Sequence, residues 1–377
     1  MTCPIRDKVN KKSLNNQSHL KRKKLRKNYQ RTHLIALVIL LGLVILLGNI
    51  LVKNFVNTYD NLILRRLQNS YIKIPNNTAF LRTSEKYLSN DYFLGTQIVG
   101  EIETNNPLMK KPFLSKKMLK LTNKLEFLAK QNPSLEPGIF IWDYSTGKYV
   151  DIKAEKEFPT ASMIKIPVLY QLFRRAELGL INFNEKIALT SYYITEGSGF
   201  LQYKPLGTAF SVNDLAKLMI QESDNTATNM ILSGIGGVND LNRVLRSWGF
   251  NKTHLSNWLP DLYGTNVATP KDMGIMLYNI DNPEFLTLQN RAKIVEIMSH
   301  VRNRFLIQAG LPDNAQFIHK TGDIGSMLGD AGIVMLPDGR KYIMVIMVKR
   351  PWNAYNAKQF IINASKITYN SYLTQDL

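Results

Sequence analysis

The pattern of apolar and polar positions divides the chain of 377 residues into a short N-terminal part and a long C-terminal part. Residues 34–52 form one uncharged apolar run, whereas from residue 115 onward short apolar segments alternate with turns. An apolar run of this length is about what a helix needs to span a bilayer. The pattern therefore predicts a transmembrane helix over residues 34–52 and a globular domain over residues 115–377.

Charge around the apolar run predicts its orientation. Residues 1–33 contain eleven lysines and arginines and one aspartate, so this tail carries +10 of the net charge of +19. The positive-inside rule places such a tail in the cytoplasm and the rest of the chain outside it. No small-residue cleavage site follows the run. We expect an uncleaved, single-pass membrane anchor with an extracytoplasmic domain, and we assign the basic tail to topology rather than to nucleic-acid binding.

The remaining composition restricts the chemistry. Residues 53–114 show no sustained period and are interpreted as a juxtamembrane stalk or a small module. The single cysteine, Cys3, lies on the predicted cytoplasmic side, so no disulfide can form within the chain. The five histidines do not have the spacing of metal ligands. We expect neither a metal nor a cofactor.

The C-terminal part predicts an α+β domain. Its expected elements, in order, are a helix over residues 115–131, a hairpin over 138–152, a helix from 162 to a cap at 179, about 130 mainly helical residues, a hairpin over 330–348 and a helix over 356–372. Because strands stand at both ends and helices in the middle, the two ends are expected to share one antiparallel sheet. The helical middle would form a second lobe.

The helix predicted to begin near Ser162 carries the main candidate for catalysis. Lys165 follows Ser162 by three residues and therefore lies on the same face of the first turn. A serine is a weak nucleophile without a base, and a buried, desolvated lysine can be that base. The same tetrapeptide pattern also begins at Ser18, Ser70 and Ser145, none of which opens an apolar helix. The pattern alone is thus compatible with chance.

Two further stretches strengthen the assignment. Ser223-Asp224-Asn225 follows a helical run, and Lys320-Thr321-Gly322 lies on a predicted strand just before the second hairpin. Singly, the first is compatible with a helix N-cap and the second with a strand end. Together with Ser162 and Lys165 they form, in order, the S-x-x-K, S-D-N and K-T-G triple of penicillin-recognising serine enzymes.

With these motifs the chain resembles the class A β-lactamase family over roughly residues 115–377. The other blocks that carry the resemblance, in their order, are residues 196–202, 223–229, 268–273 and 330–333. The resemblance implies a five-stranded antiparallel sheet flanked by helices, an all-helical lobe, and an active site in the cleft between them.

The resemblance also implies roles for the residues of the first two motifs. Ser162 would attack the lactam carbonyl, with Lys165 as base or proton relay. Ser223 would pass the proton to the leaving nitrogen, and Asn225 would contact the side-chain amide of the substrate and Lys165. A second lysine in the cleft, Lys320, would lower the pKa of Lys165, as Lys165 would lower that of Lys320, which favours a neutral base.

The third motif would bind and polarise the substrate. Lys320 and Thr321 would hold its carboxylate, and Gly322 would let the strand approach the ligand closely. The backbone N–H groups of Ser162 and Asp323 would form the oxyanion hole.

One departure from the family concerns the release of the acyl group. The family has a glutamate that activates the hydrolytic water, in a segment that corresponds to residues 258–263 here. Leu259 takes the place of that glutamate and Tyr263 that of a water-positioning asparagine. General-base assistance is worth roughly a hundredfold to ten-thousandfold in rate. Asp261 and Glu196 are candidate substitutes, although a structural role explains each of them more simply.

Three functions remain open from the sequence. The first is a β-lactamase-type hydrolase that degrades β-lactam antibiotics and confers resistance. The second is a penicillin-binding D,D-peptidase or transpeptidase-like enzyme that acts on peptidoglycan stem peptides, which the anchor and the missing glutamate favour. The third is a non-catalytic domain that binds peptidoglycan, against which the intact Ser162, Lys165, Ser223 and Lys320 argue.

Overall fold

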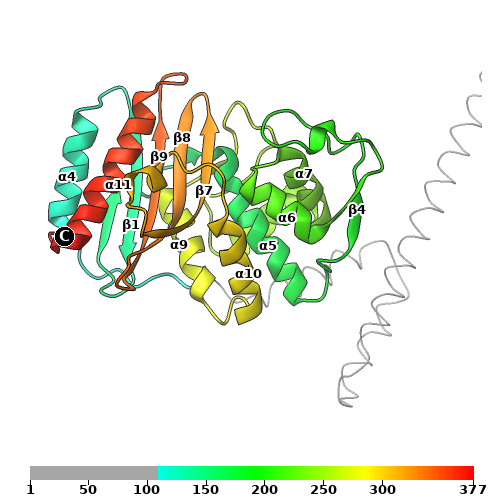
Figure 1. The fold of residues 1–377 in the computed structure, drawn as a ribbon, viewed down its shortest axis with the longest axis horizontal. Helices are drawn as coiled ribbons and strands as arrows, with labels where there is room; N and C mark the ends of the chain where they lie inside the picture. Colours follow the sequence, from blue (N-terminus) through cyan, green and yellow to red (C-terminus); the bar gives the residue numbers. More distant parts are fainter. Residues whose placement is uncertain (1–108) are drawn as a thin grey trace, which may run out of the picture. The chain divides into compact units, whose positions relative to one another are not determined.

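A computed structural model describes residues 109–377, which fold around one antiparallel sheet (Figure 1). Its strand order is β2-β1-β9-β8-β7. The strands are β1 Glu136–Asp143, β2 Tyr149–Ile152, β7 Gln316–Ile324, β8 Met327–Met335 and β9 Lys341–Lys349. The predicted α+β class and the shared sheet are confirmed, because β1 from the first hairpin pairs with β9 from the second.

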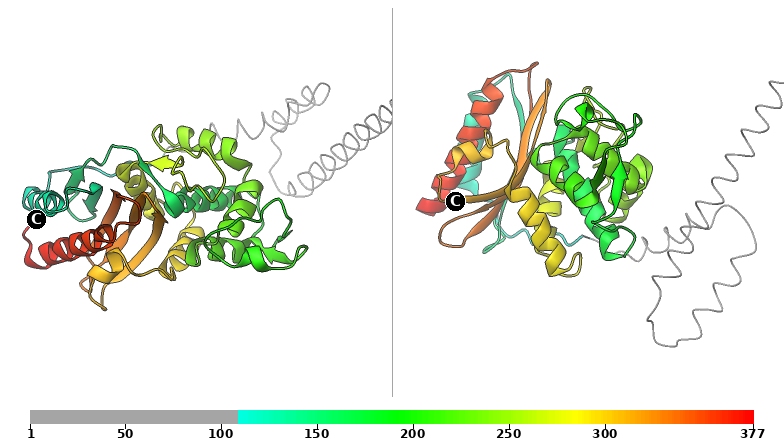
Figure 2. Two further views of the ribbon diagram at one scale, coloured as in Figure 1. Left: turned by 90° about the horizontal axis from the view of Figure 1, so that it is seen from above. Right: turned by 45° about the vertical axis from the view of Figure 1, so that its right-hand side comes forward.

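The sheet is covered by helices on both faces (Figures 1 and 2). Helices α4 (Leu119–Lys130) and α11 (Asn356–Thr374) pack together on one face, and α9 (Pro270–Tyr278) lies on the other against β1 and β9. The alternation along β1 explains this arrangement: Ile139 and Ile141 join the apolar cluster under α4 and α11, whereas Phe140 joins the cluster on the opposite side. Because both faces of these strands are buried, their sequences are nearly continuous apolar runs.

The helical lobe occupies the middle of the chain, as predicted (Figure 1). Its helices are α5 Lys165–Glu177, α6 Val212–Gln221, α7 Asn225–Gly234, α8 Gly237–Ser247 and α10 Leu288–Ser299. Two small sheets pair β3 (Phe158–Pro159) with β6 (Val267–Ala268) and β4 (Lys186–Ala188) with β5 (Ala209–Ser211). Single helical turns cover Ala161–Ile164, Leu201–Tyr203, Asn279–Asp281 and Ile307–Gly310.

The beginning of the domain differs from the expectation. The first helix starts at Leu119 rather than at residue 115, because Ser115 donates its backbone N–H to Gly147 O at 2.9 Å and the neighbouring chain bridges to the β1–β2 hairpin. Packing onto the domain also begins before residue 115, since Met109 is buried and Trp142 Nε1 donates to Phe113 O at 2.9 Å. Backbone pairing therefore outcompetes helix formation in this segment.

The predicted cytoplasmic tail, the anchor at residues 34–52 and nearly all of the stalk lie outside the described residues. Across residues 109–377, none of the helices combines the length and the apolar character that crossing a membrane requires.

A close contact between α9 and β1 gives a test of this packing. A methyl group on Gly274 would overlap the ring of Phe140. We expect Gly274→Ala to lower the stability of the domain by about 1–3 kcal/mol, because overpacking forces the buried ring to shift. Gly234→Ala is the matched control, since nothing lies within 4 Å of that position at the end of α7. Thermal unfolding should show a lower midpoint only for Gly274→Ala, and equal midpoints would contradict the described packing.

Candidate active site

Ser162 lies in the single helical turn Ala161–Ile164 that leads directly into α5. The expectation that Ser162 opens an apolar helix is confirmed, with a tighter first turn than expected. Ala161, just before it, has φ of 44°, a left-handed conformation that is costly for a residue with a Cβ atom. The turn is held by Thr160, whose backbone N–H and Oγ1 both donate to Asn266 O at 2.8 and 3.0 Å. Backbone strain is thus fixed beside the candidate nucleophile.

The amino group of Lys165 gathers the predicted residues of two motifs. Its Nζ atom lies 3.0 Å from Ser162 Oγ and 3.1 Å from Ser223 Oγ. It also donates to Ser223 O at 2.6 Å and to Asn225 Oδ1 at 2.8 Å. An ammonium group has three protons to donate and no acceptor capacity. A neutral amine, in contrast, donates two and accepts one hydrogen bond, so it can receive the proton of a serine hydroxyl.

Burial favours the neutral form of Lys165. The side chain is completely buried, and this desolvation, together with the positive charge of Lys320, holds its pKa well below the ordinary value. The carboxylate of Asp224 acts in the opposite direction but does not outweigh burial. The charge of Lys320 thus acts on Lys165 as expected, whereas the pKa of Lys320 responds to burial and Asp330 rather than to Lys165. A lowered pKa favours the neutral amine, which is the form that can act as the base a serine nucleophile needs.

The Ser223 segment is positioned by Asp224, which is buried at the N-terminus of α7. Its Oδ1 accepts the backbone N–H of Ala227 at 2.8 Å and so caps the helix. Its Oδ2 accepts the backbone N–H groups of Phe200 and Leu201 at 2.8 and 2.9 Å, which ties the preceding loop to the same point. The carboxylate of Asp224 therefore holds together the start of α7, next to Ser223, and the loop that contains Phe200 and Leu201.

The third motif lies on β7, at the edge of the sheet that faces the Ser162 turn. A Cβ atom on Gly322 would lie 2.5 Å from Thr160 O and 3.0 Å from Met163 Cγ, so only glycine lets the strand come this close. Lys320 is buried and its Nζ donates to Thr321 O at 3.0 Å. Burial lowers the pKa of Lys320 to about 8, against the opposing charge of Asp330.

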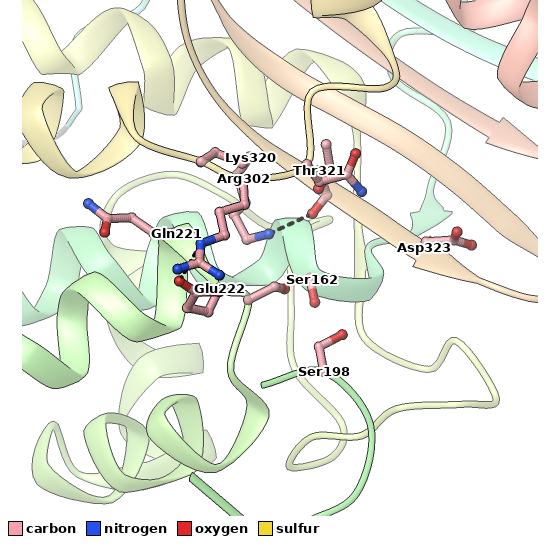
Figure 3. A pocket seen from close by; sticks show the side chains of 11 residues that line it. Ser162, Ser198, Gln221, Glu222, Arg302, Lys320, Thr321 and Asp323 are labelled. Carbon is pink, nitrogen blue, oxygen red and sulfur yellow. Dashed lines mark hydrogen bonds and ion pairs between the residues drawn. The ribbon is translucent and has the colours of Figure 1, made fainter. Parts of the chain in front are cut away.

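These elements enclose a pocket between the edge of the sheet and the helical lobe (Figure 3). Its lining residues are Ser162, Ser198, Gln221, Glu222, Ser223, Val301, Arg302, Asn303, Lys320, Thr321 and Asp323. Five predicted site residues are among them, and Lys165 and Asn225 lie directly behind Ser162 and Ser223 through the contacts given above. A serine, a buried neutral amine and a lysine that can hold an anion are the groups required for acyl transfer.

Asp261 is not among the lining residues, although the sequence made it a candidate for deacylation. Its carboxylate is buried and accepts hydrogen bonds inside its own loop, from Thr265 N at 3.0 Å, Thr265 Oγ1 at 2.8 Å and Asn266 N at 2.6 Å. These three hydrogen bonds compensate for the burial of the Asp261 carboxylate, so a structural role accounts for it without a catalytic one. Two lining residues were not predicted from the sequence. Arg302 lies in a loop without a motif, whereas Glu222 could have been noticed as the neighbour of Ser223.

Comparison with known proteins agrees with this geometry. Residues 120–372 match the family model described as the beta-lactamase enzyme family. The chain belongs to this family. It is a class A β-lactamase-like serine hydrolase, which confirms the resemblance found in the sequence.

Family relatives cover most of the described domain. Beta-lactamase VEB-1 from Pseudomonas aeruginosa is 24% identical over 68% of this chain and 91% of its own length. Beta-lactamase ROB-1 from Haemophilus influenzae is 27% identical over 56% of this chain and 70% of its own length. The structure of PBP-A is 32% identical, with a TM-score of 0.67 over 72% of this chain and 100% of that one. A mutant of PBP-A has been solved as an acyl-enzyme complex with penicillin G.

The lowered pKa of Lys320 predicts how the site responds to pH. Below about pH 8 its ammonium is charged and can hold the carboxylate of an anionic penicillin, so acylation should decline as the pH rises through about 8. In Lys320→Arg the guanidinium stays charged far above this range, and the decline should move to higher pH. The measurement is the second-order rate of acylation by penicillin G as a function of pH. An alkaline decline at the same pH in both proteins would contradict the assignment, whatever the absolute rates.

Proposed function

We propose that this family member reacts with β-lactams by forming an acyl-enzyme at Ser162. The observation that carries the proposal is the position of Lys165 Nζ, within 3.1 Å of the hydroxyls of both Ser162 and Ser223. The neutral amine takes the proton of Ser162 as its Oγ attacks the lactam carbonyl. Breakage of the carbon–nitrogen bond then needs a proton at the leaving nitrogen, which Lys165 delivers through the hydroxyl of Ser223.

The strand β7 supplies the other interactions of the proposed reaction. Lys320 and Thr321 hold the substrate carboxylate, with the charge of Lys320 favouring anionic substrates. The backbone N–H groups of Ser162 and Asp323 receive the developing negative charge on the carbonyl oxygen. Two donors that are fixed by the fold need no reorganisation when the charge appears.

The proposed reaction is slow at its second stage. Leu259 is buried, and its backbone is fixed by Asn229, which accepts from Leu259 N at 3.1 Å and donates to Leu259 O at 2.8 Å. A leucine side chain cannot take a proton from water, and the carboxylate of Asp261 is occupied within its loop. We therefore propose that hydrolysis of the acyl-enzyme limits turnover of β-lactams.

A D,D-peptidase or transpeptidase-like activity on peptidoglycan stem peptides is the second candidate. The slow hydrolysis proposed above favours it, and the similarity to PBP-A, at 32% identity over 72% of this chain, supports it. The proposed membrane anchor at residues 34–52 would hold the domain outside the cytoplasm, close to such stems. The contacts among Ser162, Lys165 and Ser223 argue against a purely binding role.

Reaction of the purified full-length chain with nitrocefin tests the proposal. We expect a stoichiometric burst of ring opening followed by a much slower steady-state rate, because acylation is equipped with a base and deacylation is not. Ser162→Ala should abolish both phases, and mass spectrometry should place the adduct on Ser162. Absence of any covalent adduct would overturn the proposed function.

The role of Leu259 is tested by placing a base at this position. Leu259→Glu should accelerate hydrolysis of the acyl-enzyme by roughly a hundredfold to ten-thousandfold, the usual contribution of a general base. Leu259→Gln is the matched control, since it has nearly the same size and polarity but cannot act as a base. The measurement is the rate at which free, active enzyme returns after penicillin is removed. Equal rates in the two variants would show that position 259 does not reach the hydrolytic water.

A further inference from the structure

The turn that follows β7 is bound by a second segment of chain, which the proposed reaction does not use. Residues 350–353 come directly after β9 and lie against the turn that joins β7 to β8. The backbone N–H of Arg350 donates to Ser326 O at 2.9 Å, and that of Asn353 donates to Gly325 O at 2.8 Å. The end of β9 is thus connected to the end of the strand that carries the third motif.

Trp352 covers the same turn. A Cβ atom on Gly325 would lie 2.4 Å from both Cδ2 and Cε2 of the indole and 2.5 Å from its Cε3, so the face of the ring rests on the glycine. Asn353, the next residue, has φ of 55°, a left-handed conformation that persists only where surrounding contacts hold it. These contacts fix residues 350–353 and the turn relative to each other.

The side chain of Arg350 extends this connection into β7. Its Nη2 donates to the carboxylate of Asp323 and to Ile324 O, the second at 3.2 Å. The side chain of Arg350 is 6% exposed, whereas that of Asp323 is 59% exposed. Packing therefore holds the guanidinium, which loses little further conformational entropy when it binds the carboxylate. A fixed cation consequently binds the last two residues of β7.

Asp323 occupies a position that needs such support. β7 is at the edge of the five-stranded sheet, with β8 as its one neighbour there, and Asp323 is the next-to-last residue of the strand. The ends of secondary-structure elements open more readily than their centres. Asp323 nevertheless lines the pocket with Ser162, and Figure 3 shows its side chain directed away from that serine. The proposed reaction uses its backbone N–H, whose direction depends on how the strand end is held.

We propose, on the basis of the acyl-enzyme assigned above, that Arg350 is a positioning residue for acylation, which holds the end of β7 so that the N–H of Asp323 faces the substrate carbonyl oxygen. Arg350 touches no reacting atom and acts through two acceptors, the carboxylate of Asp323 and the carbonyl of Ile324. Two points of attachment prevent the strand end from rotating about its own axis. Such precision matters, because a misplacement of about 1 Å can cost about a hundredfold in rate.

The guanidinium also balances a charge beside the oxyanion site. Without Arg350, the carboxylate of Asp323 would be unpaired and would oppose the negative charge that develops on the carbonyl oxygen. A variant that lacks only the arginine would therefore mix two effects. Arg350→Gln combined with Asp323→Asn removes the cation and the anion together, so a defect that remains in this double variant is one of position.

Acylation kinetics of the purified full-length chain with penicillin G test the proposal. Rapid quenching and mass spectrometry give the rate constant of acylation at saturation and the dissociation constant of penicillin, both per labelled Ser162. The double variant should lose about tenfold to a hundredfold in the rate constant, a part of the roughly hundredfold to thousandfold effect of a lost oxyanion donor. The dissociation constant should stay nearly unchanged, because the contact is made to the transition state.

The infrared spectrum of the acyl-enzyme gives a readout that a change in stability does not move. Donors in the oxyanion hole polarise the ester carbonyl and lower its stretching frequency. We expect this band to lie at higher frequency in the double variant, and isotopic labelling of the lactam carbonyl identifies it. A role of Arg350 in stability alone would lower the unfolding midpoint but leave the band and the rate per labelled site as in the unmodified protein.

Two further variants complete the test. Asp323→Ala keeps the backbone N–H but removes the attachment point, and because this side chain is largely exposed, it keeps the test available if the Arg350 variants fail to fold. It should show the same slower acylation and the same shift of the band. Arg340→Gln is the matched control: Arg340 pairs with Asp338 at 2.8 Å in the turn between β8 and β9, outside the pocket, and its loss should leave both readouts unchanged.

The outcomes separate this inference from the function on which it rests. If the unmodified protein is not labelled at Ser162, the acyl-enzyme itself is disproved. With labelling intact, slower acylation together with the shifted band supports the positioning role. An unchanged rate constant and band in the double variant or in Asp323→Ala overturn it, as does a loss confined to the dissociation constant.

Discussion

The buried amino group of Lys165 is the constraint on which the rest of the site depends. Transferring a charged amine out of water is costly, and a neighbouring positive charge at Lys320 increases the cost. The structure surrounds the amine with oxygen atoms from Ser162, Ser223 and Asn225, and burial favours its neutral form. Those atoms come from the start of α5 and from the junction of α6 and α7. Positioning one nitrogen therefore fixes two separate segments of the helical lobe.

The sheet contributes the complementary half of the site. Gly322 brings β7 against the turn that contains Ser162, and Lys320 is thereby buried close enough to influence Lys165. The side chain of Asp330 opposes the effect of burial on Lys320, so this lysine keeps a pKa of about 8, whereas burial and the charge of Lys320 lower the pKa of Lys165. Two lysines in one cleft consequently take different roles: one can hold an anion and the other can accept a proton.

Local patterns in the sequence predicted much of this arrangement. The apolar runs predicted both hairpins and the helix after Ser162. Burial of one or two faces of an element produces a regular spacing of apolar residues along the sequence. The short motifs identified Lys165, Ser223 and Lys320, because the residues of each motif are neighbours in the sequence and can be recognised together. The beginning of α4 and the surroundings of Asp261 were not predictable in this way, because they depend on pairing with distant or irregular segments. The contact between Glu222, at the end of α6, and Arg302 joins positions 80 residues apart, and no sequence motif predicts it.

The pairing of β1 with β9 has a consequence for the biosynthesis of the enzyme. The strand that begins the domain finds its central partner only when Lys341–Lys349 has been made, and Lys320 is placed by the same late strands. Contacts between residues so far apart in sequence form slowly, since a long loop must close first. A nascent chain that already contains Ser162 and Ser223 therefore has no assembled cleft. The two halves of the cleft can therefore come together only after the last strand of the sheet has been synthesised.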